Sequence, residues 1–148
     1  MKTGWQTAAP GGKAIGLMSK PRELLFDTNC LIDIYHGRSR IKPWFDQIVD
    51  GSLWPFISVI TEAELWRGLR AGEVIQHESL IAQFVVLPLH SEVAQLAGGW
   101  MQLYTANGLG WMDAFITAAA KHANLPLLTR DKKLANLLGA EVEFELYD

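Results

Sequence analysis

Short apolar segments alternate with helical segments along most of this chain, and this alternation restricts its fold more than any other feature. Five segments have the composition of buried strands: residues 24–26, 55–59, 84–87, 126–129 and 142–146. The segments between them space their apolar residues as a helix does; Val93, Leu96 and Trp100, for example, share one helical face. Strands that alternate with helices pair in parallel, and the helices then cover both faces of the sheet. The sequence therefore predicts an α/β fold with a mainly parallel, twisted sheet of roughly five strands.

One folded domain is expected. The chain has 148 residues, a common size for a single domain, and no internal repeat. Residues 1–22 are rich in Gly and Pro and carry four basic and no acidic side chains. We expect a flexible, dispensable tail at residues 1–22, with Met18 as a candidate start, and a single domain at residues 23–148.

Composition excludes several classes of protein. Apolar residues make up 49% of the chain and charged residues 20%, which excludes a disordered protein. The single cysteine, Cys30, excludes an internal disulfide framework, and no apolar run approaches the roughly 20 residues that span a bilayer. We therefore expect a cytoplasmic protein without a membrane partner.

Net charge bears on the partner. The domain at residues 23–148 holds 9 basic and 16 acidic side chains, whereas a domain that binds nucleic acid usually has a basic excess. Either nucleic acid is not the partner, or a bound metal neutralises some of the carboxylates.

Four acidic residues stand at strand–helix junctions or in the first turns of helices: Asp27, Glu64, Asp113 and Asp131. Each also has a structural interpretation. Asp27 and Asp131 suit helix N-caps, and Asp113 suits the positive end of a helix dipole. Thr61 and Glu64 have the spacing of a capping box.

The joint placement of the four carboxylates suggests a site. In a parallel sheet the strand-to-helix junctions share one edge, where such folds bind ligands. Carboxylates gathered at that edge would repel one another unless a cation lay between them. Ligand oxygens alone suit a hard divalent ion, Mg²⁺ or Mn²⁺.

Four motifs in this chain resemble those of the PIN domain family, in the family's order and spacing. They lie at residues 26–33, at 57–65 with Gly68, at 113–119 and at 128–131. The resemblance covers residues 23–148, and the wording of the motifs is closest to the VapC toxins of toxin–antitoxin pairs. It implies a PIN-like three-layer sandwich.

The resemblance also implies an endoribonuclease that uses Mg²⁺ or Mn²⁺ and a water nucleophile. Asp27 and Asp113 would be direct metal ligands, Glu64 and Asp131 would contribute directly or through water, and Asn29 and Thr129 would support them. The implied partners are an RNA substrate, a small antitoxin whose tail packs near the acidic edge, and a second copy of the chain, which would contact residues 91–124.

Five arginines near these motifs are candidate phosphate contacts: Arg38, Arg40, Arg67, Arg70 and Arg130. The alternative for each is an ordinary solvated helix surface.

Two other functions stay open from the residues alone. A strand that ends in Asp27 also resembles phosphotransferases of the haloacid dehalogenase type, although these need a second Asp where this chain has Asn29. A non-catalytic binding domain, whose carboxylates merely cap helices, is the other alternative.

The histidines and the cysteine are expected to have structural roles. His36, His77, His90 and His122 show no ligand spacing, so we expect them at the surface or an interface. Cys30 has no evident base beside it and is expected to be packed rather than nucleophilic.

Overall fold

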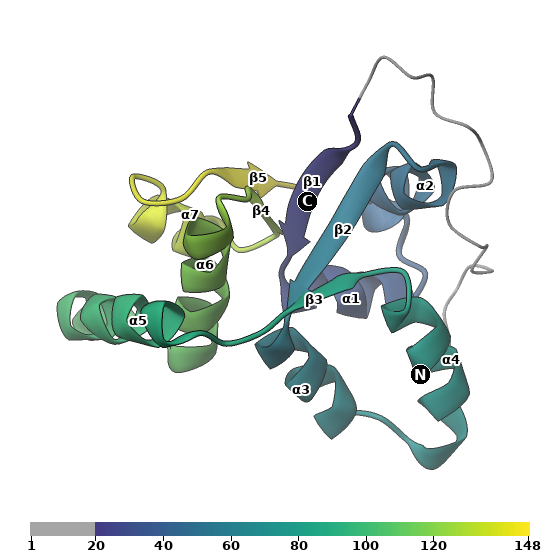
Figure 1. The fold of residues 1–148 in the computed structure, drawn as a ribbon, viewed down its shortest axis with the longest axis horizontal. Coiled ribbons are helices and arrows are strands. Elements are labelled where there is room, and N and C mark those ends of the chain that lie inside the picture. Colours follow the sequence, from purple (N-terminus) through teal and green to yellow (C-terminus); the bar gives the residue numbers. More distant parts are fainter. Residues whose placement is uncertain (1–19) are drawn as a thin grey trace.

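The computed structural model describes residues 20–148, which form one parallel sheet between layers of helices (Figure 1). The strands are Arg22–Phe26 (β1), Leu53–Ser58 (β2), Val85–Leu87 (β3), Leu127–Thr129 (β4) and Phe144–Leu146 (β5). Their order across the sheet is β3-β2-β1-β4-β5, and every neighbouring pair is parallel. The expected α/β fold is confirmed.

One or two α-helices lie in the chain between each strand and the next. Their bounds are Thr28–Tyr35 (α1), Lys42–Asp50 (α2), Val59–Arg67 (α3), Val74–Ile81 (α4), Ser91–Tyr104 (α5), Trp111–Ala123 (α6) and Lys132–Leu138 (α7). Short 3₁₀ turns at Ser39–Ile41, Ala71–Glu73 and Thr105–Asn107 complete the connections.

Local sequence sets where several helices begin and end. Ser58 caps α3 because its hydroxyl accepts the Ile60 N–H at 3.1 Å. Gly51 ends α2 with φ 82°, and Asn124 ends α6 with φ 56°. Both residue types tolerate this left-handed conformation, which terminates a helix.

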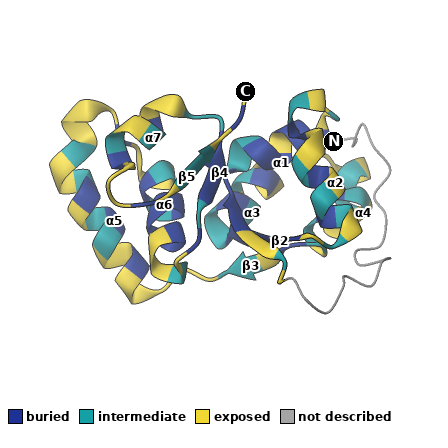
Figure 2. Ribbon diagram, turned by 90° about the horizontal axis from the view of Figure 1, so that it is seen from above, coloured by how far each residue is buried: buried dark blue, intermediate teal, exposed yellow. Residues whose placement is uncertain are grey.

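The core has two parts, one on each face of the sheet. Phe26 and Ile57 pack with residues of α1 and α2 on one face, whereas Leu25 and Leu127 pack with α5, α6 and α7 on the other. Leu25 and Phe26 are successive residues of β1, so the alternation of side chains along a strand sends them to opposite faces. Buried residues are therefore concentrated where the helices face the strands (Figure 2).

Strand order determines where a ligand can bind. The chain builds β1, β2 and β3 outward in one direction and then adds β4 and β5 on the opposite side of β1. The direction therefore reverses between β1 and β4, and open parallel sheets bind ligands at the carboxyl ends of the strands flanking such a point.

The first strand begins at Arg22, the last residue of the expected tail. The rest of that expectation concerns residues 1–19 and lies outside the described residues. Within residues 20–148, no helix is long and apolar enough to cross a membrane.

Candidate active site

Asp27 lies at the carboxyl end of β1, beside the end of β4. Its side chain is buried and accepts a hydrogen bond from Thr129 Oγ1 at 2.7 Å and another from the Thr28 N–H at 2.8 Å. Asn29 Nδ2 lies 3.3 Å from Thr129 Oγ1 and 3.5 Å from Asp27 Oδ2. These contacts hold the Asp27 carboxylate in one orientation.

Glu64 reaches the same edge from α3. Because Ser58 caps this helix, Thr61 and Glu64 lie within it, and the capping-box interpretation of this pair is wrong. Thr28 Oγ1 instead donates to Glu64 Oε1 at 2.7 Å and lies 3.0 Å from Thr61 Oγ1. This hydrogen bond holds Glu64 against α1 at Thr28, the residue that follows Asp27 in the chain.

Asp113 and Asp131 complete the group from the opposite side. Asp113 lies in the first turn of α6 and is partly buried. Asp131 caps α7 by accepting the Leu134 N–H at 2.9 Å, and its own N–H donates to Thr129 Oγ1 at 3.1 Å. The Thr129 hydroxyl thus contacts both Asp27 and Asp131.

Two carboxylates of this group, Asp113 and Asp27, have raised pKa values. Burial raises the pKa of Asp113 to about 6, and repulsion from Asp27, Asp131 and Glu64 adds to the effect. Burial also raises the pKa of Asp27, as does repulsion from Asp131 and Glu64, although hydrogen bonds from Thr129 and Thr28 oppose the shift. The fold therefore brings the four predicted carboxylates into one electrostatic field, which we call the acidic site.

The chemistry of the acidic site suits a hard divalent cation. Its donors are carboxylate and hydroxyl oxygens, which such ions prefer, and positive charge would relieve their mutual repulsion. Within residues 20–148, no three His, Cys, Asp or Glu side chains stand close enough together to enclose an ion as they are. Binding would therefore draw the carboxylates of the acidic site toward one another.

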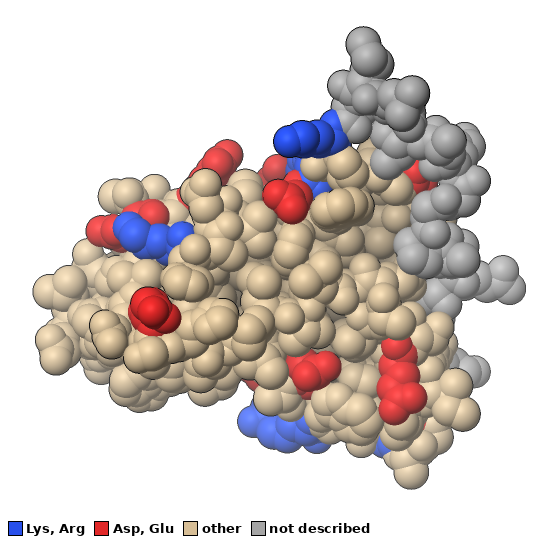
Figure 3. All heavy atoms as spheres, in the orientation of Figure 1, with Lys and Arg blue, Asp and Glu red and all other residues tan. Residues whose placement is uncertain are grey.

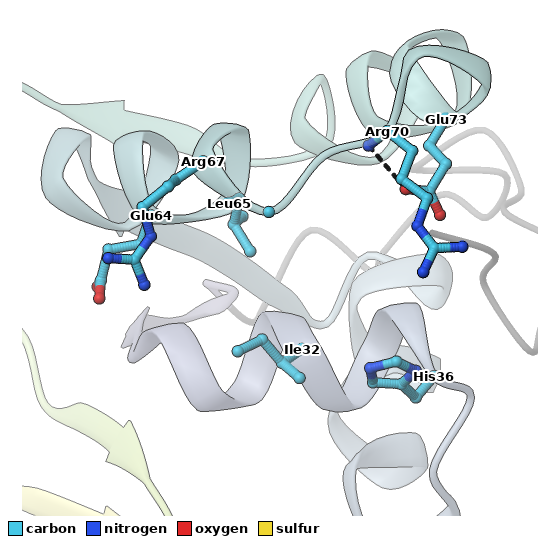
Figure 4. A pocket seen from close by; sticks show the side chains of 8 residues that line it. Ile32, His36, Glu64, Leu65, Arg67, Arg70 and Glu73 are labelled. Atoms are coloured by element: carbon cyan, nitrogen blue, oxygen red, sulfur yellow. Dashed lines mark hydrogen bonds between the residues drawn. The ribbon is translucent and has the colours of Figure 1, made fainter.

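A groove of about 500 Å³ starts at Glu64 and runs between α1 and α3 (Figure 4). Ile32 of α1 and His36, which follows α1, line one side of it, and Arg67 lines it from the end of α3. Arg70 stands at its far end, where its N–H donates to Glu73 Oε1 at 2.9 Å. Two of the five candidate arginines thus share a groove with one carboxylate of the acidic site.

The other three arginines gather around Asp33, a residue to which the sequence assigned no role. Arg38, Arg40 and Arg130 all form ion pairs with its buried carboxylate. Asp33 follows Asn29 by four residues on α1, and this spacing is the one sequence signal that could have placed both on the same helix face.

His77 corrects one expectation. It is buried, hydrogen-bonded to the Tyr35 hydroxyl and in contact with the ring of Trp66, so its place on the inner face of α4 overrides its polarity. Burial lowers its pKa. His36, His90 and His122 are exposed, as expected.

Cys30 is packed, as expected. It is fully buried and its thiol donates to the Leu128 carbonyl at 3.1 Å. Burial raises its pKa well above the usual value, which suppresses the reactive thiolate.

Comparisons with known proteins agree with this arrangement. The family model described as PIN domain matches residues 24–138. The chain is 34% identical over 109 residues to "Ribonuclease VapC10" of Mycobacterium tuberculosis, covering 72% of this chain and 80% of that protein.

Solved structures are similar as well. A toxin–antitoxin complex from Klebsiella pneumoniae contains a chain with 28% identity and a TM-score of 0.59, over 76% of this chain and 89% of that one. VapBC2 from Rickettsia felis, solved with a DNA fragment from its promoter, has 19% identity and a TM-score of 0.69, over 85% and 99% of the two chains. The second likeness concerns the fold alone.

Proposed function

Because this chain belongs to the PIN domain family, we propose that it is a VapC-type ribonuclease toxin, which cleaves RNA with a divalent metal and is restrained by an antitoxin. The observation that carries the proposal is the acidic site. Four carboxylates reach it from four separate elements, and burial together with repulsion from the other three raises the pKa of Asp113 to about 6. A fold that leaves like charges together at its ligand-binding edge is built to receive a cation.

Asp27 and Asp113 are the proposed direct ligands of Mg²⁺ or Mn²⁺, and Glu64 and Asp131 the ligands that act directly or through water. When bound, such an ion stabilises negative charge on a phosphate and lowers the pKa of water. Thr129 and Asn29 keep the Asp27 carboxylate oriented, and hydrogen bonding to Thr28 does the same for Glu64. These hydrogen bonds limit the side-chain freedom that Asp27 and Glu64 lose when a cation binds.

RNA is proposed to enter along the groove of Figure 4. Arg67 and Arg70 line that groove, and guanidinium groups match the geometry of phosphate. Attack by water on phosphorus, with the 3′-oxygen as leaving group, gives a 5′-phosphate and does not use the 2′-hydroxyl. Substrates with a single 2′-deoxy sugar at the cleavage site should therefore still be cut.

The antitoxin and a second copy of the chain are the proposed protein partners, and the cytoplasm, where both RNA and an antitoxin would be met, is the proposed location. The relatives named as toxin–antitoxin complexes support the antitoxin. Exposed apolar side chains on α5 and α6 support a homodimer through residues 91–124, because Leu103 is 67% and Trp111 51% exposed.

Cleavage of a fluorescently labelled RNA by the full chain tests the proposal. We expect activity with Mg²⁺ or Mn²⁺, none in excess EDTA, and a loss of at least about 100-fold in Asp113→Asn. Asp46→Asn is the matched control, since Asp46 is exposed and pairs only with Lys42 in the described structure. Undiminished cleavage in EDTA would contradict the proposal, and absent metal binding would favour a non-catalytic domain.

The haloacid dehalogenase alternative has no structural support. Its second carboxylate would stand at position 29, where the Asn29 amide instead contacts Thr129.

A further inference from the structure

Asp33 gathers more positive charge than its own carboxylate can balance. Its side chain is 1% exposed, and Arg40 holds it through two hydrogen bonds of 3.0 Å, from Nε to Oδ2 and from Nη2 to Oδ1. The Tyr147 hydroxyl donates to Oδ2 at 2.8 Å, and Arg130 Nε lies 2.9 Å from the same oxygen. Arg38 Nε stands 3.8 Å from Oδ1. We call these five residues the Asp33 cluster.

Both carboxylate oxygens of Asp33 have hydrogen-bond donors before Arg38 and Arg130 are considered. Arg40 and Tyr147 already supply hydrogen bonds to both carboxylate oxygens. Arg38 adds charge at 3.8 Å without a hydrogen bond to Asp33. Within residues 20–148, the ion pairs of all three arginines lead to this one carboxylate, so two positive charges are left over.

At neutral pH the Asp33 carboxyl is ionised and the Tyr147 hydroxyl is neutral. Burial alone would raise the pKa of Asp33, but hydrogen bonds from Arg40 and Tyr147 and the charge of Arg130 hold it below the usual value. Burial raises the pKa of Tyr147, so that hydroxyl stays neutral. Neither group removes the positive excess.

The surplus charge is both accessible and close to the acidic site. Side-chain exposure is 32% for Arg130, 33% for Arg40 and 50% for Arg38, so each guanidinium reaches solvent. Arg130 lies in the chain between Thr129, which contacts Asp27, and Asp131. On the face drawn in Figure 3, basic side chains are scattered among acidic ones.

We propose that the Asp33 cluster is a phosphate-binding site for the RNA strand beside the acidic site, and that Asp33 is a positioning residue that holds its arginines in place. The identity of the ligand as RNA rests on the proposed ribonuclease function. A fixed guanidinium fork binds phosphate at a lower cost in side-chain entropy than a free arginine. The cluster would bind phosphate groups of the RNA that flank the phosphate being cleaved.

Salt-dependent binding of a short, fluorescently labelled single-stranded RNA tests this proposal, with Asp113→Asn as the shared background that prevents cleavage. Each phosphate contact to a single strand contributes about 0.7 to the slope of log K against log salt. Arg38→Gln should reduce the magnitude of this negative slope by about 0.7, and the double variant Arg38→Gln with Arg40→Gln should reduce it by about 1.4. Arg22→Gln is the matched control. Arg22 is the first residue of β1, at the end of the strand away from Asp27, and it forms an ion pair with Glu145. Its substitution should leave the slope unchanged.

Asp33→Asn separates positioning from charge. It keeps all three arginines and adds one unit of net positive charge, so charge alone predicts tighter RNA binding, whereas loss of positioning predicts weaker binding. If this variant does not fold, as a thermal melt would show, Arg38→Gln still decides whether the cluster binds phosphate, since Arg38 makes no hydrogen bond to Asp33.

Cleavage by the chain with Asp113 intact keeps the two proposals distinguishable. We expect Arg38→Gln to raise KM several-fold and leave kcat unchanged. An active parent chain with an unchanged salt slope and KM in the arginine variants would overturn the phosphate site and leave the ribonuclease function standing. A parent chain that binds no RNA would overturn both, and one that binds RNA with the predicted slopes but cleaves none would overturn only the ribonuclease function.

Discussion

The acidic site and the Asp33 cluster meet at residues 129–131, and they surround a carboxylate with opposite charge. At the acidic site, Asp113 faces other carboxylates, and burial with repulsion raises its pKa to about 6. In the Asp33 cluster the carboxylate faces three arginines. Hydrogen bonds from Arg40 and Tyr147 and the charge of Arg130 hold its pKa below the usual value. Each cluster leaves charge unbalanced, negative in one and positive in the other. A cation and a phosphate group are the ligands that would balance them.

Both clusters draw on the same two stretches of chain. α1 carries Asn29 toward one and Asp33 toward the other, and the end of β4 supplies Thr129 to one and Arg130 to the other. Substitutions in the two clusters can therefore be compared directly, since the surrounding fold is shared.

The largest expected effect on stability is that of Asp33→Asn. The substitution puts a neutral amide in place of a buried carboxylate that accepts three hydrogen bonds. Losing hydrogen bonds to a charged group costs about 2–3 kcal/mol in free energy of unfolding. Urea denaturation measures the change, with Asp46→Asn at an exposed pair expected to stay within about 0.5 kcal/mol. Equal effects of the two substitutions would show that Asp33 is not the anchor of its cluster.

Asp113→Asn should shift stability in the opposite direction. Its folded pKa lies about two units above the usual value, so ionised Asp113 costs free energy in the metal-free fold. Allowing for partial exposure, we expect the variant to be about 1–2 kcal/mol more stable than the parent at pH 7 in EDTA. Added Mg²⁺ or Mn²⁺ should remove or reverse this advantage, because only the parent keeps the full ligand set. A destabilised variant in EDTA would contradict the repulsion.

Lowering the pH should change the contributions of Asp113 and Asp33 to stability differently, with smaller effects than the substitutions at pH 7. A raised folded pKa makes ionised Asp113 costly above about pH 6, and the cost fades as pH falls toward 4. The advantage of Asp113→Asn should therefore shrink by about 1 kcal/mol between pH 7 and pH 5. The depressed pKa of Asp33 keeps its contribution intact over that range, and this contribution is lost only as pH falls below about 4. Denaturation series of both variants against the parent at pH 7, 6 and 5 would check the contrast, and parallel changes in the two would contradict it.

Much of the fold is local enough to be predicted from sequence. The helices α1 and α7 begin directly after Asp27 and Asp131, the two aspartates whose sequence context suited helix N-caps. The capping-box spacing of Thr61 and Glu64 suggested a cap at Thr61, whereas the structure has it at Ser58, because sequence alone does not separate the two candidates. Strand order across the sheet depends on packing and was not predicted.

Contacts between distant residues account for what the sequence left unassigned. The four carboxylates could be proposed together because parallel strands bring their carboxyl ends to one edge. The pairing of Thr28 with Glu64, 36 residues apart, has no local signal. The same holds for Asp33 and Tyr147, 114 residues apart, and for the burial of His77 on the inner face of α4.

Calorimetric titration of Mn²⁺ into the full chain and into Asp113→Asn, at pH 7 and without RNA, tests most directly whether the four carboxylates form one cation site. The parent should bind the ion with a clear heat, and Asp113→Asn should bind it at least about tenfold more weakly. Equal binding by both chains, or none by the parent, would contradict a shared cation site.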